Sequence, residues 1–339
     1  MARNDKPFTS SCAANRLETV LVGTALDDDS DAVVRVALAA ARAAGARLHV
    51  VHAIEIEPVE MALDPMWLTG ELVEEITAER RRALAAQLTR LAAGQEIASS
   101  SVVRGEAYRV LLDAAQSARA GLIVVGAARA MGTLGRLLGS TADRLLRKSS
   151  RPLLVVRGRL ALPPERVLAP VDLAPLSLDA LRYGLHLLRQ TGDGAPARLT
   201  ALHVLDPAAH PTLRHRQMSP AELDAAEDAA RAALTAVAAD CRALEPVAVE
   251  AALRSGDPSS QILAAAEEAG ADLLLMGTHS RSPLDRLLLG SVAAQVVREA
   301  HCSVLAVPPE AALGAALAEA VVAGTEPAFS SPSALVAVR

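Results

Sequence analysis

Two glycine-containing stretches have the residue types and the spacing of a phosphate-binding site. In the later one, an apolar run ends at Gly277, and Gly290, Ser291 and Val292 open an apolar helical pattern thirteen residues further on. A glycine at the end of a buried strand lets the backbone come close to a ligand. The free N–H groups and the hydroxyl at a helix start favour an anion. The stretch therefore predicts a phosphate cradle between a strand and a helix.

The same arrangement occurs earlier in the chain with identical spacing. Gly126 ends an apolar run, and Gly139, Ser140 and Thr141 open the next helical pattern. The offset between the copies is 151 residues, as it also is from His52 to His203. Between the first apolar runs, from Val20 to Val167, the offset is only 147. The second copy therefore has four extra residues early in its sequence, and we place them in 191–196. A repeat of about 150 residues predicts two domains of one fold.

Each copy contains five apolar runs that alternate with helical patterns. Continuous apolar runs fit strands that are buried on both faces, so the alternation predicts a doubly wound parallel sheet. Ligands of such sheets bind beyond the carboxyl ends of the strands, where both strand-end glycines are expected. The expected strands are Thr19–Thr24, Arg47–Ala53, Ile97–Val103, Gly121–Val125 and Pro152–Val156 in the first copy, and Val167–Val171, Arg198–Leu205, Val247–Leu253, Asp272–Met276 and Ser303–Val307 in the second.

Three helix starts have capping signals. Residues 27–30 (Asp-Asp-Asp-Ser) are expected to cap a helix from Asp31 to Ala44. Ser219 and Glu222 have the spacing of a capping box with Pro220 between them, and Asp257 precedes a proline in the same way.

The chain is expected to divide into five parts. These are a flexible arm (1–17), a first domain (18–157), a linker with two prolines (158–165), a second domain (166–308) and a tail (309–339) with a short helix near 311–322. We refer to the two domains as the first half and the second half.

Composition excludes several classes of function. The 339 residues carry a net charge of −5 and include one Trp, two Tyr and two Phe, which argues against nucleic-acid binding. No apolar run is long enough for a membrane helix and the N-terminus lacks a signal-peptide core, so a cytoplasmic location without membrane contact is expected. The three cysteines have neither disulfide nor zinc spacing, and Cys302 is expected in the core.

These motifs resemble those of the universal stress proteins in their tandem two-domain form. The family motif is glycine, two residues, glycine, nine residues, glycine, and then serine or threonine. Ser280 and Arg129 stand at the position of the second glycine, so both copies depart from the motif there. The second copy also matches the family's first strand ending, Pro170-Val171-Asp172, and its second, His203-Val204. The first copy has Ala25 and Ala53 instead of the aspartate and the valine.

The resemblance implies an adenine nucleotide alpha hydrolase-like fold. Each half would have a five-stranded parallel sheet with the strand order 3-2-1-4-5. The halves would pack through their last strands, as the two subunits do in the homodimers of the family. Whether two copies of this chain also form a homodimer is left open.

The resemblance also implies ATP as the ligand, with Mg²⁺ accompanying its phosphates. Asp172 and Val204 would lie at the adenosine end. The phosphates would be held by Gly277, Ser280, Gly290, Ser291 and Val292 in the second half, and less favourably by Gly126, Arg129, Gly139, Ser140 and Thr141 in the first. Ser280 could donate a hydrogen bond to phosphate, whereas Arg129 could either clamp a phosphate or fill the site.

Simpler interpretations of the same residues remain open. The glycines could reflect strand-end and helix-cap geometry without a ligand. Asp172 could cap the next helix, and Asp27–Asp29 are more typical of a solvated cap than of a metal site. His52 and His203 share one repeat position, where a structural hydrogen bond is the favoured role.

Other chemistries find little support. His279, Ser280 and Asp285 lack the strained elbow of a hydrolase nucleophile, and His210 and His215 lack the cysteines of a zinc site. Neither a P-loop nor a dinucleotide-binding fingerprint is present. The sequence therefore predicts a non-enzymatic, ATP-binding regulatory protein of a stress response, with its site mainly in the second half. The alternatives are a scaffold that binds partners through 54–65 and 206–218, and an enzyme that uses an adenine nucleotide.

Overall fold

The computed structural model describes residues 16–55, 70–92, 94–95, 97–127, 138–192, 196–206, 219–244, 247–278 and 289–312. The first half contains β1 (Thr19–Gly23), α1 (Asp28–Ala44), β2 (Arg47–Ile54), α3 (Gly70–Leu91), β3 (Ser99–Arg104), α4 (Ala107–Ser117), β4 (Leu122–Gly126), α5 (Ser140–Lys148) and β5 (Leu153–Val156). The second half contains β6 (Arg166–Pro170), α6 (Pro175–Gln190), β7 (Arg198–Leu205), α7 (Pro220–Leu244), β8 (Ala248–Ser255), α8 (Pro258–Glu268), β9 (Leu273–Gly277), α9 (Ser291–Glu299) and β10 (Ser303–Val307).

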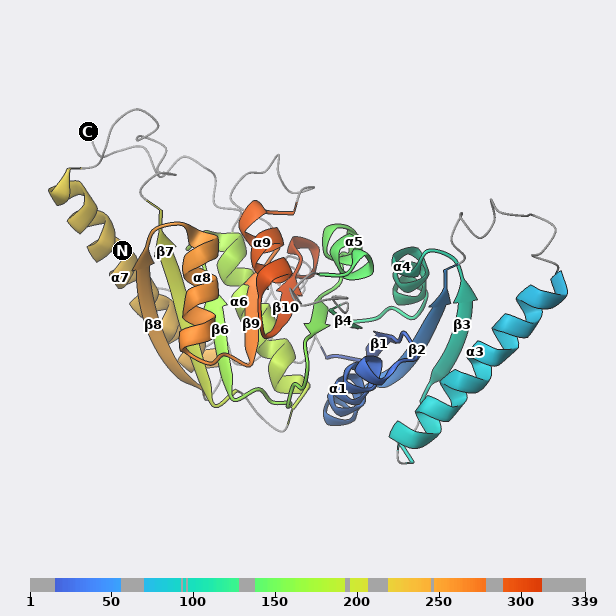
Figure 1. The fold of residues 1–339 in the computed structure, drawn as a ribbon. Coiled ribbons are helices and arrows are strands. Elements are labelled where there is room, and N and C mark those ends of the chain that lie inside the picture. The colour runs from blue at the N-terminus through green and yellow to red at the C-terminus, as the bar shows by residue number, and fades with distance from the viewer. Residues whose placement is uncertain are drawn as a thin grey trace, which may run out of the picture.

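The strands form one continuous sheet that runs through both halves (Figure 1). Its order is β3-β2-β1-β4-β5-β10-β9-β6-β7-β8, so each half has the order third, second, first, fourth, fifth strand. All pairs within a half are parallel. The halves meet where β5 and β10 pair antiparallel, with Leu305 opposite Leu154. The last strands of the two halves therefore join them into one sheet.

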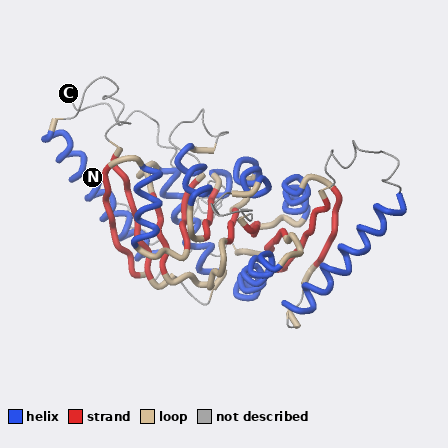
Figure 2. The backbone as a smooth tube through the Cα atoms, in the orientation of Figure 1, coloured by secondary structure: helices blue, strands red, loops and turns tan. Residues whose placement is uncertain are grey.

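Helices cover both faces of this sheet (Figure 2). The apolar residues of α1, α3, α6 and α7 pack on one face, and those of α4, α5, α8 and α9 pack on the other. Successive strand residues point to opposite faces, so Val20 and Val22 pack with the first set and Leu21 packs with the second. The strands are apolar throughout because both faces are buried.

Helix α1 begins three residues earlier than the sequence predicted. Asp27 alone is its N-cap, and its carboxylate accepts a hydrogen bond from Ser30 N at 2.8 Å. The Ser30 hydroxyl in turn accepts from Asp27 N at 3.0 Å, which completes a capping box. Asp28 and Asp29 lie in the first turn, where their negative charge interacts favourably with the positive end of the helix dipole.

The other predicted helix starts are confirmed. Ser219 Oγ accepts from Glu222 N at 3.3 Å, and Glu222 Oε2 accepts from Ser219 N at 2.8 Å. Asp257 accepts from Ser260 N at 2.9 Å and caps α8. The extra residues of the second copy lie between α6 and β7, because Arg47 and Arg198 begin equivalent strands at the larger offset.

The structure describes only short parts of the expected arm and tail. Residues 309–312 are helical after β10, whereas 1–15 and 313–339, which include most of the expected arm and tail, lie outside the described residues. Among the helices that are described, none combines the length and the apolar character needed to cross a membrane.

Candidate functional site

A cavity of about 1020 Å³ lies at the carboxyl ends of β1, β2, β4 and β5 in the first half. Gly126, Gly139, Ser140 and Thr141 all line it, so the structure brings together these four predicted residues of that half. The fifth, Arg129, lies outside the described residues. The cavity is large enough for a nucleotide, since ligand pockets commonly enclose about 300–1,000 Å³.

The start of α5 forms one end of this cavity. Gly139 is the N-cap, with φ −66° and ψ 154°, and no side chain caps the helix. The N–H groups of the first helical turn have no partners within the helix, and the helix dipole makes this end positive. Ser140 and Thr141 add hydroxyl groups to the same wall. This end of the cavity is therefore suited to an anion such as phosphate.

Charged side chains divide the cavity into an acidic and a basic end. The carboxylates of Asp27, Asp28 and Asp29 line it beside β1, together with Glu55 after β2. Glu55 also caps α4, because its Oε1 accepts a hydrogen bond from Ala107 N at 2.6 Å. The basic residues Arg157, Arg159 and His301 lie at the end of β5 and beyond.

The second half completes this cavity of the first half. Ala300 and His301, which precede β10, are among its lining residues. Arg157 lies in the same wall, and its Nη2 donates hydrogen bonds to Val297 O at 2.9 Å and Arg298 O at 3.1 Å at the end of α9. Sequence reasoning did not find His301, because only the antiparallel pairing of β5 and β10 brings it to this site.

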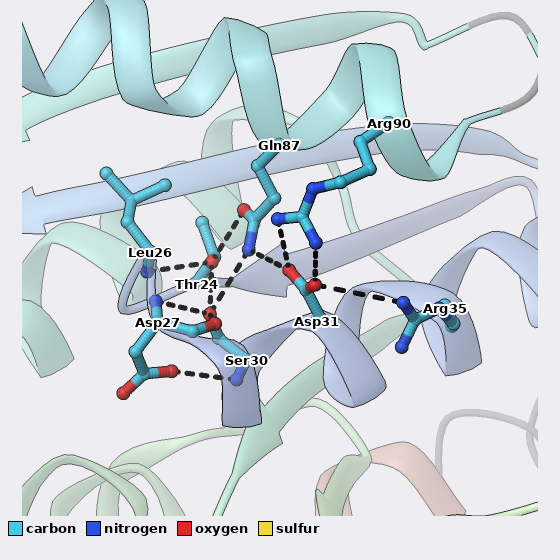
Figure 3. A network of polar contacts seen from close by, with 8 residues as sticks. All are labelled: Thr24, Leu26, Asp27, Ser30, Asp31, Arg35, Gln87 and Arg90. Carbon is cyan, nitrogen blue, oxygen red and sulfur yellow. Dashed lines mark hydrogen bonds and ion pairs between the residues drawn. The ribbon is translucent and has the colours of Figure 1, made fainter.

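A buried polar network supports the wall formed by β1 and α1 (Figure 3). Gln87 of α3 accepts a hydrogen bond from the Thr24 hydroxyl at 2.9 Å and donates one to Asp31 Oδ1 at 2.9 Å. Arg90 forms an ion pair with Asp31. Burial favours a higher pKa for Asp31, but the hydrogen bonds from Arg90 and Gln87 outweigh it and leave that pKa below its usual value. The network fixes α3 to the start of α1.

The second half has apolar residues at the corresponding positions. Val171 and Leu178 replace Thr24 and Asp31 at the offset of 147. In α7, the buried triplet Leu234, Val237 and Ala238 has the pattern of Leu84, Gln87 and Leu88 in α3. The fold therefore does not require the network. The network had one signal in the sequence, which was Gln87. It stands at a position of α3 where the equivalent helix α7 buries an apolar side chain.

Two equivalent histidines have the structural role that was predicted for them. His52 Nδ1 lies 2.9 Å from Thr24 O, and His203 Nδ1 lies 2.8 Å from Val171 O. Both rings are buried. Burial lowers the pKa of His52 from its usual value, and the hydrogen bond to Thr24 opposes this shift only in part.

Strained backbone follows the first strand of each half. Leu26 and Leu173 have φ values of 64° and 62°, in the left-handed region that a branched side chain rarely adopts. They occupy the same repeat position and immediately follow Ala25 and Asp172. Strain of this kind persists where the surrounding structure enforces it, and it is often found next to binding sites.

The predicted residues of the second half lie at the corresponding edge of the sheet. Asp172 directly follows Val171 after β6, Val204 is near the end of β7, and Gly277 ends β9. Gly290 is the N-cap of α9, with φ −59°, ψ 139° and no capping side chain, and α9 then begins with Ser291 and Val292. Ser280 lies outside the described residues, as do His279, Asp285, His210 and His215.

Asp172 also has a local structural role. Its Oδ1 accepts a hydrogen bond from Ala174 N at 3.0 Å, and its own N–H donates to Ser177 Oγ at 3.2 Å. This turn leads into α6, whose N-cap is Ala174. The aspartate thus shapes the entry to the helix without capping its first turn.

The strand-end glycines allow helices to approach the sheet. A β-carbon on Gly126 would lie 3.1 Å from Val33 Cγ2, and one on Gly277 would lie 3.2 Å from Ala180 Cβ. Both distances are shorter than ordinary van der Waals contact. Close helix packing is therefore a structural reason for both glycines that involves no ligand, and the binding argument depends on the helix starts.

Comparisons with known proteins agree with this architecture. A model described as the universal stress protein family matches residues 16–157 and again 164–308. A universal stress protein of Mycolicibacterium smegmatis is 31% identical over 303 residues, which cover 86% of this chain and 97% of that relative. A universal stress protein of Methanocaldococcus jannaschii is 28% identical over 143 residues, covering 42% of this chain and 81% of its own length.

Two crystal structures share the fold over most of this chain. A universal stress protein from Archaeoglobus fulgidus has a TM-score of 0.57 and 20% identity, covering 86% of this chain and 96% of its own. A Pseudomonas aeruginosa protein described as functionally unknown has a TM-score of 0.59 and 17% identity, covering 93% and 100%. Because two family matches together span most of its length, this chain belongs to the universal stress protein family and has two domains of that family in tandem.

Proposed function

We propose that this chain binds ATP or a closely related adenine nucleotide, mainly in its second half, and acts as a regulatory protein in a stress response. The observation that carries the proposal is the uncapped start of α9, with Gly290 as its N-cap, at the same sheet edge as Asp172. A positive helix end and a carboxylate on neighbouring elements suit the two ends of a nucleotide.

Each residue of the site has a definite part in the proposal. The N–H groups of the first turn of α9 bind the phosphates, and the Ser291 hydroxyl adds a donor. The Asp172 carboxylate accepts hydrogen bonds from the nucleoside, and Val204 gives its base an apolar surface. Gly277 lets α6 pack closely against the end of β9.

We assign the chain a binding rather than a catalytic role. Mg²⁺ would accompany the phosphates and supply positive charge there, since it commonly binds nucleotides through phosphate oxygens and few protein ligands. Because β5 and β10 already pair within the chain, a homodimer of it would have to use a different surface.

The first half offers a second location for the nucleotide. Its cavity combines the uncapped start of α5 with basic residues at one end and carboxylates at the other. Against this location, Ala25 stands where the second half has Asp172. The scaffold alternative relies on loops that fall largely outside the described residues, and the enzymatic alternative requires a general base that the motifs do not supply.

The test is nucleotide binding by the parent chain and by Gly290→Val and Gly139→Val. Both glycines have negative φ and extended ψ, so valine fits the backbone while its side chain crowds the N–H groups of the helix start. Titration calorimetry and thermal unfolding with Mg-ATP measure the effect. Ligand at 100 times its Kd stabilises the folded chain by about 2.7 kcal/mol, which raises the Tm by several degrees.

We expect the parent to bind, Gly290→Val to lose most of the binding, and Gly139→Val to retain it. The opposite pattern would move the site to the first half. Absence of binding at millimolar Mg-ATP would support the scaffold alternative, and steady turnover of ATP would support the enzymatic one.

A further inference from the structure

A second cavity, of about 440 Å³, lies between the two halves, at the end of the sheet where β4 and β5 begin. The turns before these strands contribute Arg119 and Arg151, and the segment before β1 contributes Arg16. From the second half, α6 contributes Tyr183 and three further residues. Leu17 N donates a hydrogen bond to Gln190 Oε1 at 2.6 Å, which holds the segment before β1 against α6.

The arginines of this cavity have hydrogen-bonding capacity to spare. Within the part of the chain that the structure describes, the guanidinium groups of Arg119 and Arg151 form neither a hydrogen bond nor an ion pair, and Arg16 makes one long contact, 3.5 Å, to Ala44 O. Two glutamates, Glu18 and Glu310, also line the cavity, so its lining contains three arginines and two glutamates, all of them exposed residues. The formal balance is positive.

The repeat within the chain provides a control for this lining. At the offsets of 147 and 151, the residues that correspond to Arg119, Arg151 and Tyr183 are Gly270, Cys302 and Val36. His186 and Gln190 correspond to Ala39 and Ala43. The equivalent positions in the other half are thus small or apolar. The fold does not demand polar residues at these five positions, whereas two other lining residues, Glu18 and Ser150, correspond to Glu165 and His301, which are also polar.

Arg119 provides a second, independent indication. Its φ is 52°, and the equivalent Gly270 has a φ of 56°. Glycine adopts this conformation without strain, whereas arginine rarely does. The chain therefore places a large cationic side chain at a position where its own second copy has the residue that the backbone favours. Strained residues retained in this way are commonly functional.

We propose that this cavity binds a small molecule with phosphate or carboxylate groups. Arg119 and Arg151 bind the anionic group with charge-assisted, bidentate hydrogen bonds, for which the guanidinium geometry is suited. The Tyr183 hydroxyl, whose pKa burial raises and the nearby Arg151 charge partly lowers again, stays protonated and donates to the same group. Glu18 and Glu310 accept hydrogen bonds from hydroxyl groups of the ligand. This site is separate from the proposed nucleotide site and does not depend on it.

The experiment uses the full chain and two probes, inorganic phosphate and citrate, titrated by calorimetry at constant ionic strength. The variants are Arg119→Gly and Arg151→Gln. Arg119→Gly introduces the residue that the second half has at this position with the same backbone conformation, so it should fold. Arg81→Gln, on the exposed face of α3, is the charge-matched control. All titrations are repeated in Gly139→Val/Gly290→Val, so that phosphate bound at the helix starts is not counted.

We expect one of the probes to bind the parent, and each cavity variant to weaken that binding by about tenfold, the loss of one charge-assisted contact. Arg81→Gln and the double glycine variant should retain the affinity. The comparison of phosphate with citrate identifies the anionic group. The proposal is overturned if neither probe binds more tightly than about 10 mM, or if Arg81→Gln weakens binding as much as the cavity variants do.

Discussion

Leu275 of β9 fills the space that a β-carbon on Gly184 of α6 would occupy. Such a carbon would overlap Leu275 Cδ1 and would lie 3.1 Å from its Cδ2. In the first half, the equivalent residues are Ala37 of α1 and Val124 of β4. The pair of glycine and leucine has the same number of side-chain carbons as the pair of alanine and valine. The two halves thus fill this contact equally but divide the carbons differently between helix and strand.

This relationship predicts a compensating pair of substitutions. Gly184→Ala should destabilise the chain by about 2 kcal/mol, because overpacking a closed contact exceeds the gain from alanine in a helix. Adding Leu275→Val should restore most of that loss, since the double variant reproduces the contact of the first half. Urea unfolding followed by circular dichroism measures both. Purely additive effects of the two substitutions would show that they do not share the contact.

The polar network of the first half predicts a similar exchange. Asp31→Leu alone should cost about 2 kcal/mol, because it removes the carboxylate acceptor of the buried Gln87 amide, which then keeps only its contacts to Ser30 and Thr24. The triple variant Thr24→Val/Asp31→Leu/Gln87→Val copies the apolar set of the second half. It should return to within about 1 kcal/mol of the parent, since buried polar groups can often be replaced together by apolar ones. If the triple variant is less stable than Asp31→Leu, the apolar set does not fit the first half.

The pKa of Asp31 predicts a specific acid sensitivity. Burial opposes ionisation of this carboxyl, but Arg90 and Gln87 lower its folded pKa below the unfolded value of 3.8. Its ionised form therefore stabilises the fold fully at pH values well above 3.8, and this contribution is lost as the pH falls through the lower, folded pKa. The difference in unfolding free energy between the parent and Asp31→Asn should be constant from about pH 7 to pH 5 and shrink below about pH 4.

A matched control makes the acid measurement specific. Asp28→Asn changes an exposed carboxylate in the first turn of the same helix. Its difference from the parent should not follow the curve of Asp31→Asn. A pH-independent effect of Asp31→Asn down to pH 2.5 would contradict the lowered pKa, as would identical curves for the two variants.

The sequence predicted the strands well because buried parallel strands are unbroken apolar runs. The runs ending at Gly126 and Gly277 both proved to be strands, β4 and β9, followed by helices that begin at Ser140 and Ser291. The equal spacing of the two copies supported each assignment twice. Helix starts were less certain. Any of three successive aspartates could have been the N-cap of α1, and only the contact to Ser30 N identifies Asp27.

Features that depend on distant contacts could not be predicted. The position of Gln87 on its helix signals a buried polar side chain, but the sequence does not identify Thr24 and Asp31 as its partners, because they are more than fifty residues away. His301 reaches the cavity of the first half only through the pairing of β5 and β10. The preference for the second half as the nucleotide site rested on Asp172, on Val204 and on Ser280 in place of Arg129, and it stays a prediction.

The two described cysteines should be inert in the folded chain. Cys241 and Cys302 are buried, as was expected for Cys302, and burial raises the pKa of each thiol to about 11. At pH 8 only about a thousandth of each would be thiolate, the form that reacts with disulfide reagents. We therefore expect a Cys12→Ser variant to react with dithionitrobenzoate only when guanidinium unfolds it, and then to release two equivalents. Reaction of either thiol within minutes under native conditions would show that α7 or the start of β10 opens readily, and peptide mapping of the labelled chain would identify which of them does.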